Sequence, residues 1–445
     1  MTSAAQPDGK TGVDVDALLE FMFRLGQAYL ASGEQTPQVE LTLRRIATAY
    51  GMRRARVVAF PTAIFISVHD GASERVTLSE GATQTLRLDQ IGDVFALGAA
   101  ALRAEVRPGE GLERLSGILR RSGRFGRTGI VVGNAVLSLG LALLLTVSPA
   151  NLAAAFLLGA LVGGVKTLKS DQAVLSVPTP VIAATLVSGL VFFGIRYGLP
   201  LNPGYLLVPP LVTFLPGAML TYGMVELAYG DLVSGSSRLV GGLVQLVLLA
   251  IGLAAGAMLV GLAPADLSGV PRDVVEQPWV PWVGVVVFAL GVAIHFSAPR
   301  NAVGWLLLVV LSAFAAQRAA ATVIDVHASG FFGALVATPL AYLIQLRFKG
   351  PPAAVTFLPS FWMLVPGSLG LLSVTRMFGD RESGLDELVV VIFSVVSIAL
   401  GTLVGASMYR WLTERYGWWQ LQLGRAGKYF RRDDKRRHGS APNDH

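Results

Sequence analysis

Long apolar segments fill the chain from Thr128 onward, and they constrain its fold more than any other feature. They cover roughly residues 128–147, 150–167, 177–198, 204–228, 237–262, 280–296, 301–318, 328–347, 352–375 and 386–411. Each approaches the ~20 residues that a helix needs to cross a bilayer core. Backbone in lipid must satisfy its hydrogen bonds internally, and helices of this length do so. We therefore predict an α-helical integral membrane protein with ten transmembrane helices.

Composition agrees with a membrane protein and excludes some chemistry. Hydrophobic residues make up 53% of the chain and charged residues only 15%, unlike a soluble enzyme of similar length. The chain has no cysteine, which excludes disulfides, thiolate metal sites and cysteine nucleophiles. The net charge of +7 comes from basic residues beside apolar segments, so membrane topology explains it better than nucleic-acid binding.

The membrane region contains an internal sequence duplication. The word Val-Thr-Phe-Leu-Pro occurs at 212–216 and again at 355–359, and Gly-Asp occurs at 230–231 and at 379–380. The second Gly-Asp follows the first at the same spacing that separates Gly252 from Gly401 and Gly256 from Gly405. The chain thus divides into membrane repeat 1 (128–262) and membrane repeat 2 (280–411), with five spans each. Because five is odd, we predict that the two repeats are inverted.

Prolines and glycines interrupt the duplicated spans. Such breaks free backbone groups and are tolerated at membrane depth only where these groups face protein or a water-filled cavity. Paired broken helices are the best sequence indicator of a transporter's binding site. We predict that the substrate binds among the following residues: Thr213, Pro216, Gly217, Thr356, Pro359, Pro366 and Gly367. The alternative is that these prolines only kink helices.

Three acidic residues near the breaks are candidates for proton coupling: Glu226, Asp231 and Asp380. Carboxylates in or beside a membrane span commonly take part in proton relays. Asp231 and Asp380 are equally suited to cap the helices that follow them, and Glu226 is placed to pair with Arg238. For Lys166 we favour a structural role as a charge that faces water, and for His295 an interfacial role over proton transfer.

The first part of the chain has a different pattern. We predict a disordered lead (1–12) and a cytosolic α+β domain (13–121) with helices at about 15–30, 36–50, 88–103 and 111–121. Thr36 and Pro37 are expected as the N-cap and first residue of the second helix. β-rich runs occupy about 56–68 and 75–78.

The distribution of basic residues predicts the orientation. Arginines and lysines precede the first span, follow the last, and lie at the ends of the second and eighth spans, all on one side if the spans alternate. By the positive-inside rule, that side and both termini are cytoplasmic. The basic tail (412–445) directly follows a span, so anionic lipid is the expected partner, not nucleic acid.

Several of these features resemble the bacterial threonine/serine exporter family. The N-terminal stretches at 25–33, 40–45 and 60–65 are similar to its soluble domain, and the duplicated Pro-Gly spans with their acidic turns are similar to its membrane part. The resemblance implies a secondary transporter in the cytoplasmic membrane of a bacterium. It implies export of threonine and serine driven by the proton motive force.

Other functions stay open. One is an exporter of another small solute; another is a membrane-anchored protein whose N-terminal domain is a hydrolase or a regulatory module. The lack of catalytic motifs favours the module and a protein that is not an enzyme. Residues 159–167 approach a phosphate-binding loop, but the lysine is misplaced and the segment lies in an apolar span. We predict no cofactor and no metal, and a homo-oligomer is left open.

Overall fold

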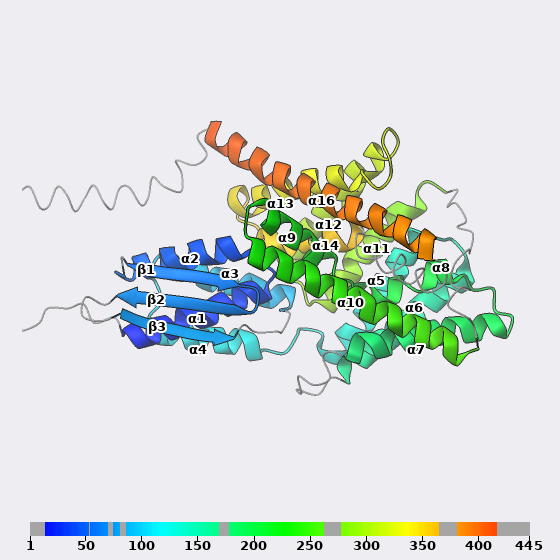
Figure 1. Ribbon diagram of the computed structural model, residues 1–445, viewed down its shortest axis with the longest axis horizontal. Coiled ribbons are helices and arrows are strands. Elements are labelled where there is room, and N and C mark those ends of the chain that lie inside the picture. Colours follow the sequence, from blue (N-terminus) through cyan, green and yellow to red (C-terminus); the bar gives the residue numbers. More distant parts are fainter. Residues whose placement is uncertain are drawn as a thin grey trace, which may run out of the picture.

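The computed structural model describes residues 14–52, 54–69, 74–80, 86–168, 178–261, 277–364 and 381–415, and most of these are helical. Two buried hydrophobic clusters organise it, one in the N-terminal elements and one in the apolar helices. Figure 1 shows the N-terminal elements at one end of the bundle of apolar helices. The predicted disordered lead and all of the basic tail beyond residue 415 lie outside the described residues.

The N-terminal elements combine four helices with a small antiparallel sheet. They are α1 (Val15–Ala31), α2 (Thr36–Ala49), β1 (Ala55–Phe60), β2 (Ala63–His69), β3 (Glu74–Glu80), α3 (Leu88–Leu102) and α4 (Pro108–Arg120). The strands pair in the order β1-β2-β3. Val57 and Ala59 alternate with outward-facing neighbours on β1, so one face of the sheet contributes to the buried cluster with the helices.

Two helix starts differ from their predicted positions. Gln35, not Thr36, is the N-cap of α2, which places Thr36 inside the helix with its hydroxyl free to bond elsewhere. Helix α4 begins at Pro108, where the predicted helix began at 111. Proline suits the first helical turn because its missing N–H would have no partner there.

The apolar helices follow the predicted spans closely. They are α5 (Gly126–Leu143), α6 (Pro149–Thr167), α7 (Pro178–Arg196), α8 (Pro203–Leu206), the 3₁₀ helix η2 (Pro209–Phe214), α9 (Gly217–Ala228), α10 (Leu232–Leu259), α11 (Val280–His295), α12 (Arg300–Ala320), α13 (Gly330–Arg347), α14 (Ala353–Leu364) and α16 (Arg381–Arg415). Within the described ranges, seven helices are long and apolar enough to cross a membrane, or eight if the bent pair 203–228 is one span. Of the ten predicted spans, those at α11 and α14 are too short, as described, to count.

Glycines bring α5 and α11 into close antiparallel contact. A methyl group added at Gly140 would lie 2.2 Å from the backbone nitrogen of Phe288, and one added at Gly291 would lie 2.3 Å from that of Leu137. Small residues at such crossings allow membrane helices to pack backbone to backbone. The two helices that open the predicted repeats are therefore packed directly on each other.

The same kind of contact joins α10 to α7. Gly252 and Gly256 of α10 face the carbonyl oxygens of Val181 and Thr185, at 2.6 and 2.4 Å from the position of an added Cβ.

An equivalent contact joins α16 to α13. Gly401 and Gly405 of α16 face the carbonyl oxygens of Phe331 and Leu335, at 2.2 and 3.0 Å from the position of an added Cβ. The duplicated glycines therefore pack in the same way on α7 and on α13, each the third helix of a predicted repeat.

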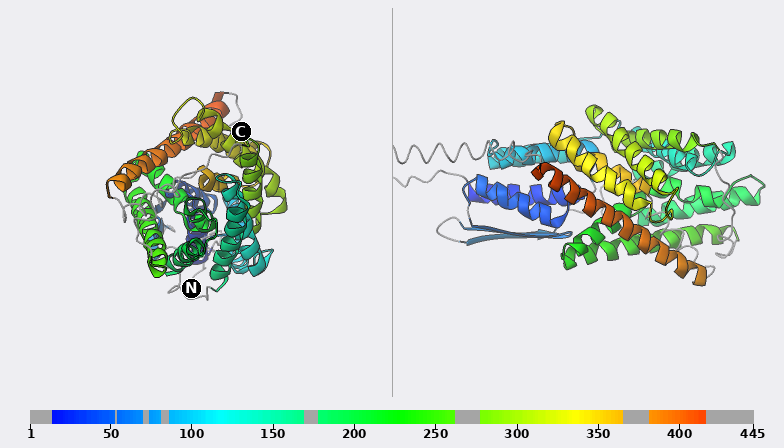
Figure 2. Two further views of the ribbon diagram at one scale, coloured as in Figure 1. Left: turned by 90° about the vertical axis from the view of Figure 1, so that its right-hand side faces the viewer. Right: turned by 90° about the horizontal axis from the view of Figure 1, so that it is seen from above.

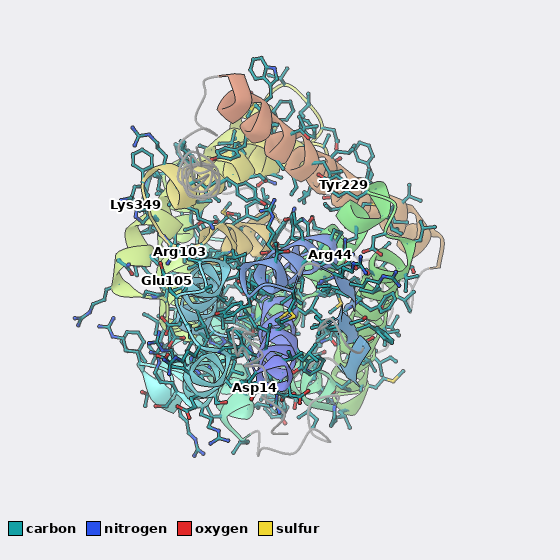
Figure 3. All side chains as sticks on the ribbon, turned by 90° about the vertical axis from the view of Figure 1, so that its left-hand side faces the viewer. Asp14, Arg44, Arg103, Glu105, Tyr229 and Lys349 are labelled. Atoms are coloured by element: carbon teal, nitrogen blue, oxygen red, sulfur yellow. The ribbon has the colours of Figure 1, made fainter. Side chains whose placement is uncertain are left out.

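Helix α14 lies inside the ring of longer helices when the bundle is seen end-on (Figure 2). Its contacts with α9, α11, α12 and α13, and with α3 of the N-terminal elements, agree with this central position. Seen from the opposite end, the N-terminal elements stand in front of the membrane helices, between Tyr229 and Lys349 (Figure 3).

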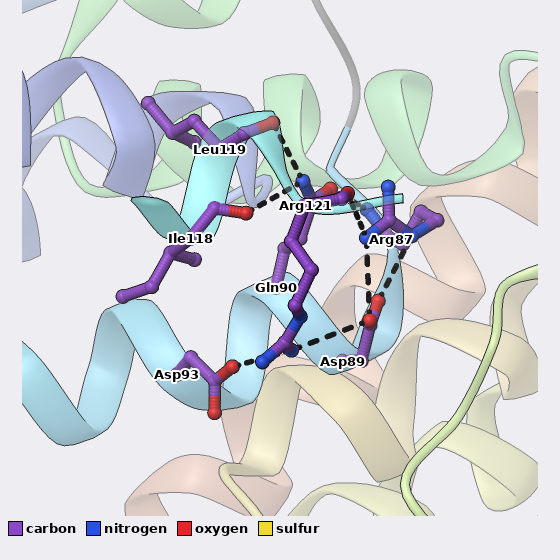
Figure 4. Close-up of polar contacts among 7 residues, drawn as sticks. All are labelled: Arg87, Asp89, Gln90, Asp93, Ile118, Leu119 and Arg121. Carbon is purple, nitrogen blue, oxygen red and sulfur yellow. Dashed lines mark hydrogen bonds and ion pairs between the residues drawn. The ribbon is translucent and has the colours of Figure 1, made fainter. Parts of the chain in front are cut away.

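A polar cluster fixes the end of α4, where the chain leaves the N-terminal elements (Figure 4). Arg121 reaches Asp93 at 2.6 Å and Asp89 at 3.4 Å, and Asp89 also pairs with Arg87 at 3.0 Å. Gln90 donates to the carbonyl oxygens of the last turn of α4. The neighbouring Leu88 N–H donates to the carbonyl of Phe296 at 3.0 Å, which ties the start of α3 to the end of α11.

Candidate functional site

The fourth apolar segment is broken in its middle. The two parts, 203–214 and 217–228, are bent by 63° from each other. Pro209 and Pro210 open η2, and Pro216 is the N-cap of α9, so three residues near the break lack a backbone N–H. Gly217 is the buried first residue of α9. The break that the sequence predicted is therefore present, and it leaves the first N–H groups of α9 without partners in the preceding turn.

Thr213 lies just before the break and joins two neighbouring helices. Its hydroxyl accepts a hydrogen bond from the Lys166 ammonium of α6 and donates one to Asn134 Oδ1 of α5 at 3.2 Å. Asn134 is fully buried and donates to the carbonyls of Gly159 at 2.9 Å and Pro210 at 3.3 Å. The Thr213 hydroxyl, predicted from the sequence to bind a substrate, is thus bonded to protein groups, and a ligand there would have to compete with them.

His295, at the end of α11, completes this polar cluster. Its Nδ1 lies 3.0 Å from the carbonyl oxygen of Ile130, and its Nε2 lies 3.4 Å from Lys166 Nζ. A carbonyl only accepts, so Nδ1 carries the proton and the Nε2 lone pair faces the ammonium. Lys166 also lies 4.6 Å from the centre of the Phe214 ring. We call Asn134, Lys166, Thr213 and His295 the break cluster.

Aromatic side chains connect the break cluster to α14. The rings of His295 and Phe296 meet edge to face at 4.7 Å, and Phe296 stacks on Trp362 of α14 at 4.8 Å. Tyr222 of α9 packs edge to face on Phe361 of α14 at 5.2 Å. The second copy of the motif therefore approaches the first through aromatic contacts.

The candidate residues of the second copy are only partly described. Thr356 and Pro359 are buried in α14, and the Thr356 hydroxyl donates to the carbonyl of Ala353 at 3.2 Å, within its own helix. Pro366, Gly367 and Asp380 lie outside the described residues.

Glu226 lies at the other end of α9, in a second polar cluster. Its side chain is fully buried and pairs with Arg238 of α10 at 3.0 Å, which is the structural alternative to proton coupling that the sequence left open. The backbone N–H of Thr36 donates to Glu226 Oε1 at 3.1 Å, and Arg238 also donates to the carbonyl of Glu34 at 3.0 Å. The turn between α1 and α2 is thus bound to the end of the fourth span.

Asp231 belongs to the same cluster and has two roles. It is the N-cap of α10, accepting from Ser234 N–H at 3.3 Å, and it accepts from the Thr36 hydroxyl at 2.6 Å. That hydroxyl also lies 3.3 Å from Glu226 Oε1. A hydroxyl has a single proton, so both contacts are hydrogen bonds only when one of the two carboxyls is protonated. We call Thr36, Glu226, Asp231 and Arg238 the carboxylate cluster.

Thr213, Glu226 and Asp231 were candidates from the sequence, whereas Lys166, His295 and Thr36 had no predicted functional role. Lys166 stands in the last turn of an apolar span, where basic residues are common by the positive-inside rule, so its position did not mark it for a functional role. Nothing local marks Thr36, whose partners lie 190 and 195 residues away. Among the described residues, no group of three metal-ligating side chains of the His, Cys, Asp and Glu types comes together.

Comparison with known proteins adds the family. No curated protein and no solved structure matches the chain. The model of the threonine/serine exporter family, ThrE, matches residues 20–260, from within α1 to the end of α10. The matched part includes both polar clusters except His295, and it is more than half of the 445 residues. The chain belongs to the threonine/serine exporter family.

Proposed function

We propose that this protein is a secondary transporter that exports threonine and serine across the bacterial cytoplasmic membrane, driven by the proton motive force. The observation that carries the proposal is the family match, which spans the N-terminal elements and the broken fourth span together. A broken span suits a zwitterionic substrate, because its free N–H groups and carbonyls compensate charges that are costly to bury.

The proposed architecture is ten transmembrane helices in two inverted five-helix repeats. The direct antiparallel packing of α5 on α11 supports it, since a two-fold axis in the membrane plane would relate two such helices. The equivalent contacts of Gly252 with α7 and of Gly401 with α13 support the same relation. Helices α11 and α14 would then be spans as well, α14 together with residues beyond Leu364.

In the proposed topology both termini are cytoplasmic, with the N-terminal elements as a cytosolic α+β domain. Lys166, His295 and Glu226 then lie toward the cytoplasmic ends of their spans. The N-terminal elements lie on the same side, since they contact Glu226 through Thr36 and the end of α11 through Leu88. The basic tail is proposed to bind anionic lipid at the inner leaflet.

Proton coupling is proposed at the carboxylate cluster. The Thr36 hydroxyl lies 3.3 Å from Glu226 and 2.6 Å from Asp231. It can donate to only one of these carboxyls, so the other contact becomes a hydrogen bond when that carboxyl takes up a proton. Protonation would therefore change how firmly the α1–α2 turn holds the fourth span. Asp380 is proposed as the counterpart in the second repeat on the sequence duplication alone.

Efflux from cells tests the function. Cells preloaded with a threonine- or serine-containing dipeptide are expected to release the free amino acid faster with the protein than without it, and an uncoupler should abolish the difference. Equal release from both, with the protein present in the membrane, would contradict the export of these amino acids. Uncoupler-resistant release would contradict only the energy source.

Substitution of the breaking prolines tests the substrate site. Pro216→Ala with Pro366→Ala restores two N–H groups at the breaks and should lower export by about tenfold or more, because displaced binding groups lose orientation. Pro149→Ala is the matched control, since Pro149 is the exposed first residue of α6. Unchanged export by the double variant, at normal protein levels, would place the substrate elsewhere.

A second candidate role concerns the N-terminal elements, which we propose to act as a gating module. They contact the first repeat through Thr36 and Glu226, and the end of α11 through Leu88 and Phe296. A module bonded to both repeats at one end of the bundle can restrict passage there. The rival hydrolase role predicts turnover of peptides or esters by the purified full chain, and such activity would favour it over the module.

A further inference from the structure

Lys166 is held at the break of the fourth span by neighbours from two other elements, η2 and α11. Its ammonium donates to Thr213 in η2, lies 3.4 Å from His295 Nε2 in α11, and lies over the Phe214 ring. The packing of α6 on α5 fixes this position, because a methyl group at Gly163 would lie 2.7 Å from the Cα of Val131. The charge is therefore positioned by the tertiary fold and does not follow its helix freely into water.

A second positively polarised feature follows the Lys166 contacts closely along the chain. Thr213 and Phe214, which contact Lys166, end η2, and α9 starts three residues later at Gly217. The free N–H groups of a helix start carry a partial positive charge and bind anions. An ammonium and such a helix start together are suited to bind a carboxylate. Both supply hydrogen-bond donors, and neither supplies an acceptor that would repel the carboxylate.

The contacts of Lys166 with His295 and Thr213 can be exchanged for a ligand. The imidazole offers only its Nε2 lone pair at 3.4 Å, a long distance for a hydrogen bond. A carboxylate is a stronger acceptor for an ammonium than a neutral imidazole or a hydroxyl. The Thr213 hydroxyl keeps its bond to Asn134 at 3.2 Å if the ammonium turns away.

We propose that Lys166 binds the carboxylate of the transported amino acid at the break of the fourth span, with His295 as the neutral partner that the carboxylate displaces. This inference rests on the proposed function and specifies its substrate class, the α-amino acids with a free carboxylate. The hydroxyl of threonine or serine is then not the main recognition element. Amino alcohols with the same ammonium and hydroxyl lack the group that Lys166 binds.

Binding to the purified full-length protein tests the proposal. The probes are L-threonine and 1-aminopropan-2-ol, which is threonine without its carboxylate, and the variants are Lys166→Gln and Lys166→Arg. We expect Lys166→Gln to weaken threonine binding by about tenfold or more, as for a lost charged hydrogen bond, and to leave the weak binding of the amino alcohol unchanged. Lys166→Arg should retain part of the threonine affinity. Lys349→Gln is the control, because it removes an exposed lysine after α13.

The outcomes separate this inference from the function it rests on. Unchanged threonine affinity in Lys166→Gln, while the wild-type protein binds and exports threonine, would overturn the inference alone. Equal loss of both probes would also overturn it, since a structural or coupling role predicts that result. Failure of the wild-type protein to bind or export threonine and serine would overturn the proposed function, and the inference with it.

The proposal can also be tested on the wild-type protein, so that the result does not depend on whether a variant folds. Acylation of lysines by a water-soluble ester, followed by mass spectrometry, reports the accessibility of each ammonium. Threonine should protect Lys166 and leave Lys349 unprotected, whereas 1-aminopropan-2-ol should protect neither. Equal acylation of Lys166 with and without saturating threonine would contradict the proposal.

Discussion

Thr36 links the N-terminal elements to both carboxyls of the carboxylate cluster. We expect Thr36→Val, which keeps the shape and removes the hydroxyl, to lower the free energy of unfolding by about 1–3 kcal/mol, since buried acceptors lose a donor. Thermal unfolding in detergent measures this change. Thr48→Val is the control, because the exposed Thr48 hydroxyl only returns to the carbonyl of Arg44 at 2.9 Å; an equal shift in both variants would contradict the prediction.

Glu34, in the same turn, makes the stability of the protein depend on pH. Burial raises the pKa of the Glu34 carboxyl, more than the Gln35 N–H and the charge of Arg238 lower it. A raised pKa favours the protonated form in the folded state. The resulting stability is fully present below the pKa of the unfolded chain and is lost as pH rises through the raised folded-state pKa.

Glu34→Gln tests this sign, because glutamine resembles the protonated carboxyl. The variant should match the wild type near about pH 4 and be more stable toward about pH 8. Melting temperatures across that range measure the difference. Glu113→Gln, at an exposed position of α4, should show no such trend. A stability gain of Glu34→Gln that shrinks as pH rises would show that the sign is wrong.

At the scale of elements, α3 contains two glycines in opposite surroundings. A methyl group added at Gly98 would lie 1.8 Å from the Tyr29 hydroxyl oxygen, whereas one added at Gly92 meets nothing within 4 Å. Gly98→Ala should therefore lower the free energy of unfolding by about 1–3 kcal/mol through overpacking. Gly92→Ala should raise it by up to about 1 kcal/mol, because alanine is the better helix former. Thermal unfolding of both variants checks the opposite signs, and a loss in both would contradict the packing argument.

The elements themselves were largely predictable. Apolar length located the membrane helices, and Pro-Gly located the break at Pro216, because both signals are local. The predicted starts of α2 and α4 were less accurate, because Thr36 and Pro108 are each compatible with more than one position in the first turn of a helix. The partners of Thr36 explain why it is not the cap: its hydroxyl bonds to Asp231 instead.

At the scale of the whole molecule, the proposed topology places Tyr197 outside the cell and Lys349 inside. Tyr197 is 72% exposed just after α7. Lys349 is exposed just after α13 and is labelled in the view from the end with the N-terminal elements (Figure 3). The chain has no cysteine, so Tyr197→Cys and Lys349→Cys each introduce a single thiol. A membrane-impermeant maleimide should label Tyr197→Cys in intact cells and Lys349→Cys after the cells are opened. Labelling of both in intact cells would contradict the orientation.

The sequence by itself determined the membrane character of this protein, its helices and the place where its fourth span breaks. These properties depend on apolar length and on prolines, which act on neighbouring residues. Only the tertiary structure decided which side chains meet at the break and at the end of α9. Lys166 and His295 lie 129 residues apart, and Thr36 and Glu226 lie 190 apart. Their contacts depend on how α5, α6, α9 and α11 pack, and helix packing is set by complementary surfaces that no local pattern specifies.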